Sequence, residues 1–493
     1  MRNRMQVLTW ATALALGAPA VAPTQETLRQ PAGVHETPAG GDRRTVEFWE
    51  TLGDTTLQRL VREALGANRD VEVARARVSG ARAARLGAAL DLAPTVTAVG
   101  GYSRQQMASP MVPGAIGRLP EQDLWDAGLR ASWEVDVFGR LRHSLRGQGE
   151  LVSAADEGVR DVRVAVASQL ATAYFELRGA QDRLAVAQRN AENQRGTLEV
   201  TQLRLEAGRG TALDTERAQA QLSATLAVIP ALEARIAAAQ YRIAVLAGRP
   251  AAAVVPELAA AAPPVVLPDA PEVVAPEVAV RQRPDVRSAE REVAASSAFV
   301  GAAKADYLPR LAVGGTAGYT GSSFESIGNR GTPRYAFGPV VSWPALDLGR
   351  VRAGVDAAQA GEAAARARYE QTVLRSVEEV ETSLITYRKA RERLRHLADA
   401  AAASERAAEL ARLRYTEGAS DFLQVLDAER TMLDRQNERA QGLTEATTGL
   451  VAVYRALAVR PPPSAEPAPR APPAWGAWRP SSPRGGSGAR RRA

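Results

Sequence analysis

Two kinds of hydrophobic pattern alternate along the chain, and each occurs in both halves. Polar and apolar residues alternate with period two in TVTAVGGYSR, directly after Pro94, and again in AGLRASWEVDV, where Leu129 and Trp133 share one face. The same alternation returns in the second half, directly after Pro309. Period two is typical of strands with one buried face. The pattern therefore predicts four strands, over about 94–105, 126–137, 309–320 and 334–344.

A long tract with few helix-breaking residues follows each predicted hairpin of strands. The tracts run from about 141 to 207 and from about 351 to 417, and a helix of that length extends on the order of 100 Å. Sevenfold spacing of apolar residues in both tracts indicates a coiled-coil seam with small partners, although ordinary helix pairs within the chain have the same spacing. The seam residues are Leu170, Leu177, Leu184, Ala191, Leu198 and Leu205, then Val380, Tyr387, Leu394, Ala401, Ala408 and Tyr415.

Each tract ends at a turn that contains glycine, in RLEAGRGTALD and RYTEGASDFLQVLD. Glycine adopts the left-handed conformation that ends a helix, so Gly208 and Gly418 are predicted to be turn points. A second helix then runs back from each turn. The predicted helical hairpins span residues 140–247 and 350–457.

The two halves of the chain are copies of one unit. Asn68 corresponds to Arg283 at an offset of about 215 residues, and Ser132-Trp133 corresponds to Ser342-Trp343 at an offset of 210 residues. Arg204 and Gly208 correspond to Arg414 and Gly418 at the same 210-residue offset. A repeat of this length indicates a duplicated structural unit. We predict a first repeat over 46–250, an Ala/Pro-rich linker over 251–278 and a second repeat over 279–459, with a disordered Pro/Arg-rich tail over 460–493.

Composition favours long helices and excludes several kinds of chemistry. The chain is 45% hydrophobic but only 5% aromatic, as expected for helices that pack through small side chains. It has no cysteine, which excludes disulfides and thiolate metal sites. Its three histidines, His35, His143 and His396, lie too far apart to suggest a metal motif. No phosphate loop or nucleophile–base set occurs, so we predict no enzyme, no cofactor and no bound metal.

The positive charge lies mainly at the ends of the chain. The formal net charge is +7, yet from Arg460 onward seven arginines face one acid, Glu466, and Arg2 and Arg4 add to the excess. The rest of the chain is nearly neutral. A neutral body has no electrostatic surface for a polyanion, so we predict no nucleic-acid partner.

The N-terminus has the three parts of a secretory signal peptide, predicted over residues 1–20. A basic start precedes an apolar run from Val7 to Gly17 and then small residues. No later segment offers 18 uninterrupted apolar residues, so any membrane crossing has to use strands. Four strands cannot close a barrel, and an open sheet edge leaves backbone groups unpaired in lipid, so crossing requires an oligomer. A soluble antiparallel sheet is the alternative.

Several segments, in order and in duplicate, resemble the outer-membrane efflux channels related to TolC and OprM, in the branch that serves resistance-nodulation-division pumps. The resemblance covers about residues 46–458. The segments that carry it, specific in combination, are FWETLGDTTLQRLVREALGANRDVEVARARV (48–78), SWEVDVFGR (132–140), TAYFELRGAQDRL (172–184), RPDVRSAER (283–291), YLPRLAVGG (307–315), SWPALDLGR (342–350) and RYTEGASDFLQVLDAER (414–430).

The resemblance implies a mainly α-helical chain with a membrane β-barrel. Three chains would each give four strands to a twelve-stranded barrel in the outer membrane and their helices to a periplasmic coiled-coil tunnel. The implied partners are outer-membrane lipid, a periplasmic adaptor and an inner-membrane pump, and the implied function is passive exit of small toxic compounds or drugs. A duct for type I protein secretion and a soluble periplasmic coiled-coil scaffold remain the alternatives.

The family's tunnel closes at its periplasmic end, which gives candidate gate residues. Asp427 stands at the position of the family's LDA acid and Tyr415 at its tip tyrosine. Gln424 replaces a residue that is acidic in TolC, and Asp421 is a nearby acid. A ring of aspartates attracts cations and resists anions. Alternatively, Asp427 faces solvent or caps a helix.

The turns themselves are implied to contact the adaptor. The residues concerned are Arg204, Gly208, Asp214, Arg414 and Gly418, with Asp214 also expected to have a structural role. Many pump-linked members carry a lipid on a cysteine after the signal peptide; with no cysteine, this chain is predicted to lack that lipid and to rely on its barrel.

Overall fold

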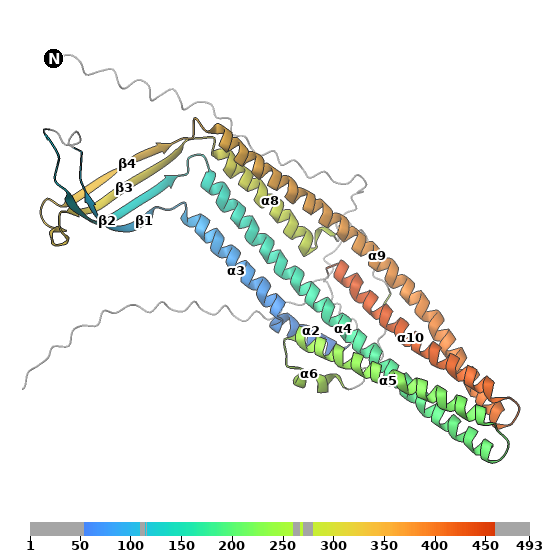
Figure 1. Ribbon diagram of the computed structural model, residues 1–493. Coiled ribbons are helices and arrows are strands. Elements are labelled where there is room, and N and C mark those ends of the chain that lie inside the picture. The colour runs from blue at the N-terminus through green and yellow to red at the C-terminus, as the bar shows by residue number, and fades with distance from the viewer. Residues whose placement is uncertain (1–53, 109–113, 115, 260–266, 270–279, 459–493) are drawn as a thin grey trace, which may run out of the picture. The chain divides into compact units, whose positions relative to one another are not determined.

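A computed structural model describes residues 54–108, 114, 116–259, 267–269 and 280–458 of the chain (Figure 1). The chain divides into two units, residues 1–44 and 45–493, and every described residue belongs to the second. The predicted signal peptide and the predicted basic tail therefore lie outside the described residues. The fold is helical with one small sheet.

Four antiparallel strands form one sheet in the order β1-β2-β3-β4. They are β1 Thr95–Gln105, β2 Gln122–Val135, β3 Arg310–Gly321 and β4 Pro333–Ser342. The two predicted hairpins join through β2 and β3, where Leu129 lies opposite Ala317. β2 begins four residues before the predicted start, because Gln122–Trp125 continue the ladder along Tyr102–Gln105. The rings of Tyr102 and Trp125 pack against each other there in a tilted arrangement, with centroids 4.7 Å apart.

The register gives the sheet one apolar and one polar face. Directly opposite residues in an antiparallel pair share a face, so a row such as Ala98, Leu129, Ala317 and Tyr335 crosses all four strands. The same face carries Val96, Ala131, Trp133, Val313, Tyr319, Phe337 and Val341. The opposite face carries Thr97, Asp126, Arg130, Thr316, Thr320 and Arg334. Within the described residues, β1 and β4 each pair on one side only.

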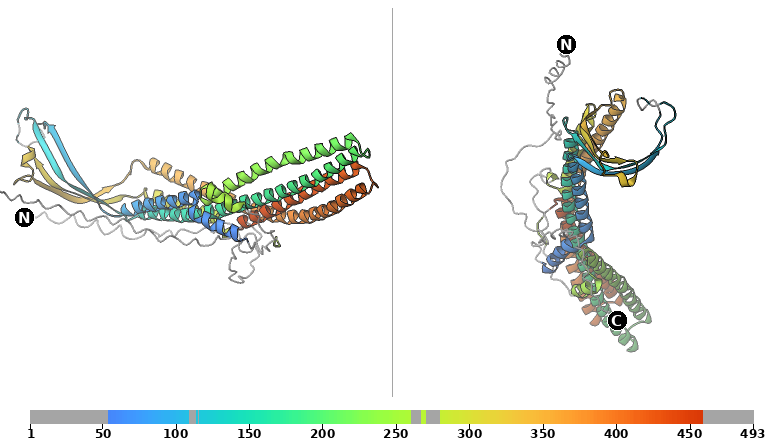
Figure 2. Two further views of the ribbon diagram at one scale, coloured as in Figure 1. Left: turned by 90° about the horizontal axis from the view of Figure 1, so that it is seen from below. Right: turned by 90° about the vertical axis from the view of Figure 1, so that its left-hand side faces the viewer.

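Two long helical hairpins make up most of the fold outside the sheet. The first consists of α4 Arg140–Glu206 and α5 Ala212–Ala247, and the second of α9 Leu348–Thr416 and α10 Phe422–Ala456. Two further helices, α3 Arg69–Leu90 and α8 Pro284–Ala305, precede β1 and β3. Near the sheet, α3, α4, α8 and α9 pack in a row; toward the turns the row is α5, α4, α10 and α9 (Figures 1 and 2).

The duplication is preserved in individual contacts. The indole Nε1 of Trp133 donates to Leu92 O at 2.9 Å, and that of Trp343 donates to Tyr307 O at 3.0 Å. Each indole therefore ties the end of a strand hairpin to the residue two positions before the proline that precedes that hairpin, Pro94 or Pro309. The side chain of Asn68 donates to Leu246 O at 2.9 Å. Its counterpart Arg283 donates to Ala456 O at 2.8 Å, and so ties the start of α8 to the end of α10.

Two short helices cover one face of α4 and α5. They are α2 Thr55–Ala67 and α6 Ala251–Leu258. The segment predicted as a linker over 251–278 therefore begins with a helix: Val254 and Leu258 are fully buried, so this Ala/Val-rich segment folds against the core despite Pro256. The remaining linker residues are described only at 267–269 and from 280 onward.

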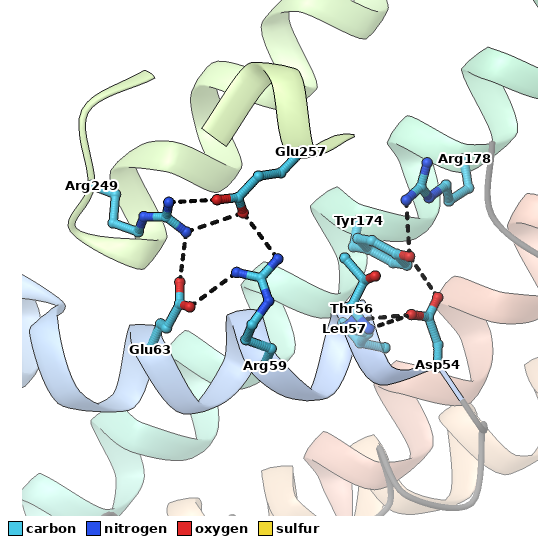
Figure 3. A network of polar contacts seen from close by, with 9 residues as sticks. All are labelled: Asp54, Thr56, Leu57, Arg59, Glu63, Tyr174, Arg178, Arg249 and Glu257. Atoms are coloured by element: carbon cyan, nitrogen blue, oxygen red, sulfur yellow. Dashed lines mark hydrogen bonds and ion pairs between the residues drawn. The ribbon is translucent and has the colours of Figure 1, made fainter. Parts of the chain in front are cut away.

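Ion pairs and a buried tyrosine fasten these short helices (Figure 3). The guanidinium group of Arg249 lies between Glu63 of α2 (2.9 Å) and Glu257 of α6 (2.7 Å). The hydroxyl of Tyr174 on α4 donates to Asp54, whose other carboxylate oxygen caps the start of α2. Burial, and then the Asp54 carboxylate, raise the pKa of Tyr174 well above its ordinary value, so the hydroxyl stays protonated as a donor.

Most positions of the seam predicted from sevenfold spacing are buried. Leu170, Leu177 and Ala191 of α4 are buried, as are Val380, Tyr387, Ala401, Ala408 and Tyr415 of α9. Leu205, the last seam position on α4, is 38% exposed.

One described helix, α5, is long and apolar enough to cross a membrane by length and composition alone, and 17% of its most apolar stretch is buried. A crossing by strands alone was predicted because no segment has 18 uninterrupted apolar residues; α5 is apolar enough on average even though charged residues interrupt it. α5 packs along α4, and Glu233 and Arg235 lie midway along it. Its exposed apolar residues include Leu213, Val228, Tyr241 and Val245.

Candidate functional site

The two helical turns have nearly identical geometry. Gly208 has φ +69° and Gly418 has φ +75°, the left-handed conformation that glycine adopts without a steric penalty. After each glycine the chain bonds back to the helix it has left: Arg209 N donates to Arg204 O, and Ala419 N donates to Arg414 O, both at 2.8 Å. These bonds satisfy carbonyls that a helix end leaves unpaired.

Two of the predicted site acids stabilise helix starts. The hydroxyl of Thr211, the N-cap of α5, donates to the carboxylate of Asp214 at 2.7 Å and accepts from Asp214 N. Asp421 is the N-cap of α10, and its carboxylate accepts from Gln424 N at 3.1 Å. Thr211 and Asp421 correspond at the 210-residue offset, so both second helices begin at equivalent positions.

Arg204 clamps the first turn to the second. Its guanidinium group lies over the ring of Tyr415, with the central carbon 4.2 Å from the ring centroid. The same group donates to Tyr415 O at 2.6 Å and to Thr416 O at 3.1 Å, two carbonyls at the end of α9. A cation at a helix C-terminus and over an aromatic face is stabilising on both counts.

Tyr415 lies inside a small apolar cluster and contributes little to the surface of the tip. It is 7% exposed and packs against Phe422, with ring centroids 5.7 Å apart, and against Ala218 and Val425. The structure therefore brings Arg204 and Tyr415 together, two residues that the sequence placed at different turns. Their contacts join the two turns.

The remaining candidates point outward. Asp427 and Gln424 are both exposed and lie three residues apart, on one side of α10. Within the part of the chain that the structure describes, neither the Asp427 carboxylate nor the Arg414 guanidinium has a hydrogen-bond or ion-pair partner. Asp427 is not a helix cap, since Asp421 fills that position.

A buried ion pair above the turns was missed from the sequence. Glu429 is 2% exposed; its carboxylate accepts from Arg412 at 2.7 Å and from the Thr197 hydroxyl at 2.8 Å. It joins α4, α9 and α10 at one point. A signal was available, because Glu429 falls on the same helix face as Phe422, Val425 and Met432, where an apolar residue is expected.

The candidate site consists of contacts that hold the two turns together and of charged side chains. It combines a cationic clamp, a buried ion pair and an exposed carboxylate at the tips of two helical hairpins. Among the described residues, no group of three or more His, Asp or Glu side chains could hold a metal ion.

Comparison with known proteins identifies the family. The family model described as outer membrane efflux protein matches residues 60–249 and 275–459. Nodulation protein T of Rhizobium leguminosarum bv. viciae is 29% identical over 412 residues, which cover 83% of both chains. Outer membrane protein OprJ of Pseudomonas aeruginosa is 28% identical over 462 residues, covering 90% of this chain and 94% of OprJ.

Solved structures agree with the sequence comparison. The structure of the outer-membrane channel OprN superimposes with a TM-score of 0.77 at 37% sequence identity, covering 87% of this chain and 99% of OprN. The two matched segments cover most of the two predicted repeats, and the fold is that of outer-membrane channels with a helical barrel and a β-barrel. This chain belongs to the outer membrane efflux protein family.

Proposed function

We propose that three copies of this chain close into one duct, which forms the outer-membrane exit of a tripartite efflux system for small toxic compounds or drugs. A periplasmic adaptor and an inner-membrane pump would supply the compounds, and the duct itself would do no chemistry. The observation that carries the proposal is the four-stranded sheet, which has one apolar face, one polar face and two edges that no described strand pairs.

The sheet is suited to lipid only after closure. In a bilayer each unpaired backbone group costs several kcal/mol, so β4 of one copy must pair with β1 of the next. The apolar face, with Leu129, Phe337 and Tyr335, would then meet lipid. The polar face, where Arg334 bonds Asp126 at 2.6 Å, would line the pore.

The helical row has matching open edges. α9 bounds the row on one side, and α3 and then α5 bound it on the other. The edge helices expose large apolar side chains, among them Leu374, Ile385, Leu410 and Leu413 on α9. In a closed ring, α9 would pack on α5 of the next copy and cover the apolar face that gives α5 its resemblance to a membrane helix.

The 210-residue offset predicts residue pairs between copies. Within one chain the first hairpin contacts the second, so in a ring the second contacts the first hairpin of the next copy in an equivalent way. Arg204 bonds Tyr415 O and Thr416 O. The unpaired Arg414 would accordingly bond the carbonyls of Leu205 and Glu206 of the neighbouring copy.

We place the gate at these turns, with Asp427 as its exposed acid and Gln424 beside it. Asp421 would act there mainly as a helix cap, and the turn residues Gly208, Asp214 and Gly418 would shape the surface offered to the adaptor. Tyr415 would hold the closed arrangement through Arg204.

Replacing Asp427 by alanine should raise the closed-state conductance of purified channels in planar bilayers and reduce their preference for cations. A ring of three carboxylates attracts cations and narrows the opening, and alanine removes both effects. Glu417→Ala is the matched control, because Glu417 is an exposed acid at the same tip. Conductance and selectivity equal to those of the unmodified channel would remove Asp427 from the gate.

Drug accumulation tests the function itself. Cells that lack this chain, and lack other exit ducts, should accumulate toxic compounds that they otherwise expel, and the unmodified chain should reverse the effect. Unchanged accumulation of every compound, together with loss of an exported protein from the medium, would favour a protein-secretion duct instead.

A further inference from the structure

A recess at mid-height of the helical row is lined by three arginines and one acid. It has a volume of about 450 Å³ and lies where α4, α5 and α10 meet. Small residues of α4 and α5 form much of its wall, namely Ala173, Gly179, Ala180, Ala238 and Ala239. Arg183, Arg235, Arg242 and Glu176 supply the charge, and Gln441 and Thr444 of α10 close one side.

Among the described residues, none of the three guanidinium groups forms an ion pair. Arg183 Nε donates to Asn437 Oδ1 at 2.6 Å, which fixes the side chain and leaves its two terminal nitrogens unbonded. Arg242 donates to Gln169 at 3.0 Å. Across the described ranges, no acid forms an ion pair with Arg183 or Arg235.

Like charges meet in this recess. Burial, and then the charge of Arg235, lower the pKa of the Arg183 guanidinium. An anion between the two groups would replace this repulsion by attraction, and a guanidinium group binds carboxylate and sulfonate oxygens in a two-point geometry.

The recess opens on the face of the row opposite to α2 and α6. On α4, Tyr174 bonds Asp54 at the start of α2, and Gln181 Nε2 donates to Leu258 O at the end of α6 (2.8 Å). Glu176 lies two residues after Tyr174, and Arg183 lies two residues after Gln181; in each case the rotation around α4 is about 200°. In the proposed trimer, α2 and α6 add a second layer that fits only on the outside of the tube, so the recess faces the duct.

We propose that this recess is a binding site for organic anions, in which Arg183 and Arg235 hold a sulfonate or carboxylate group and the alanine wall contacts an apolar body. The inference rests on the proposed function for its place on the transport path, where three such sites would favour amphipathic anions among the compounds conducted. Glu176, at the rim, would disfavour a second negative charge.

Calorimetric titration of the purified full-length protein with 1-naphthalenesulfonate tests the site. We expect saturable binding that weakens about ten- to a hundredfold in Arg183→Gln and in Arg235→Gln, since each removes one charge-assisted contact. Arg235 is exposed and its replacement should leave the fold intact. Arg189→Gln is the matched control, an exposed arginine of α4 outside the recess, and should bind like the unmodified protein.

A neutral ligand of the same shape separates charge from shape. Naphthalene-1-sulfonamide should bind more weakly than the sulfonate and should not distinguish Arg235→Gln from the unmodified protein. Equal binding of the sulfonate to all variants, or equal binding of both ligands, would overturn the site. Conductance measured on the same preparations is independent of these outcomes: an intact channel with no anion site contradicts this inference alone, whereas absent conductance contradicts the channel.

Discussion

Channels in which Arg204 and Arg414 are both replaced by alanine should conduct about ten to a hundred times more current, averaged over time, than unmodified channels. Arg204 makes two charge-assisted hydrogen bonds and one cation–π contact across the turns. Contacts of these kinds are worth about 1.5–3 kcal/mol and 0.5–2 kcal/mol respectively. A change of about 1.4–2.8 kcal/mol in the balance between closed and open tips shifts the open population ten- to a hundredfold.

The effects of Arg204 and Arg414 on the current should be separable by single substitutions. Arg204→Ala removes an observed contact within one chain, and Arg414→Ala removes the predicted equivalent between copies. Each single change should give part of the increase.

Arg209→Ala is the control for charge at the tip, since Arg209 is exposed and lies in the same turn. Its conductance should match that of the unmodified channel. If Arg204→Ala also leaves the current unchanged, the clamp does not hold the gate. If only Arg414→Ala is silent, the equivalence between contacts within and between copies is wrong.

Replacing Gly179 by alanine should destabilise the helical row, whereas the same change at Gly196 of the same helix should stabilise it slightly. A methyl group on Gly179 would overlap the Thr444 hydroxyl and approach Thr444 Cβ to 3.0 Å and Cγ2 to 3.1 Å. Rotation of Thr444 exchanges these atoms without making room. Around Gly196 nothing lies within 4 Å of the added atom.

The two substitutions should change the free energy of unfolding in opposite directions. Overpacking costs about 1–3 kcal/mol, while glycine to alanine in an open helix gains up to about 1 kcal/mol. Thermal unfolding of the purified protein should therefore order the variants as Gly196→Ala, unmodified, then Gly179→Ala. Thr444→Ala removes the two clashing atoms and should restore most of the loss when combined with Gly179→Ala. Equal unfolding temperatures for the two glycine variants would show that α4 and α10 are not in close contact.

The long elements were predictable because their signals are local and repeated. Period-two alternation, sevenfold spacing and the two glycine turns each depend on residues close in sequence, and the seam at Leu170, Leu177 and Tyr387 is buried as expected. α6 was missed because Pro256 and its short length resemble a linker. The ion pairs of Glu257 with Arg249 and Arg59 join α6 to the rest of the fold, and the sequence pattern does not reveal them.

The candidate site likewise has parts that the sequence predicted and parts that needed the structure. Arg204 and Tyr415 were each identified from the turn sequences, but their contact joins residues 211 positions apart and needed the structure. Asp421 was considered as a gate acid, and its capping bond to Gln424 N follows from the backbone of the turn. The Glu429–Arg412 pair and the arginine recess combine three helices, and no single segment contains their pattern.

Cross-linking between copies tests closure into a trimer most directly. Asn190 of α4 bonds Gln436 of α10 at 2.8 Å, which fixes the antiparallel register of these two helices within one chain. The same register, applied at the 210-residue offset to α9 of one copy and α5 of the next, places Ile385 opposite Tyr241. Both side chains are 57% exposed in the single chain. Because the chain has no cysteine, Ile385→Cys with Tyr241→Cys introduces the only two thiols.

A bismaleimide that spans neighbouring helices, about 8–10 Å between axes, should link this variant in membranes into dimers and trimers and no larger species on a denaturing gel. Ile385→Cys with Val228→Cys, displaced by about 20 Å along α5, should give little product. The account predicts a ladder that stops at three chains. Absence of cross-linking in the matched pair, or a ladder that continues beyond three, would contradict it.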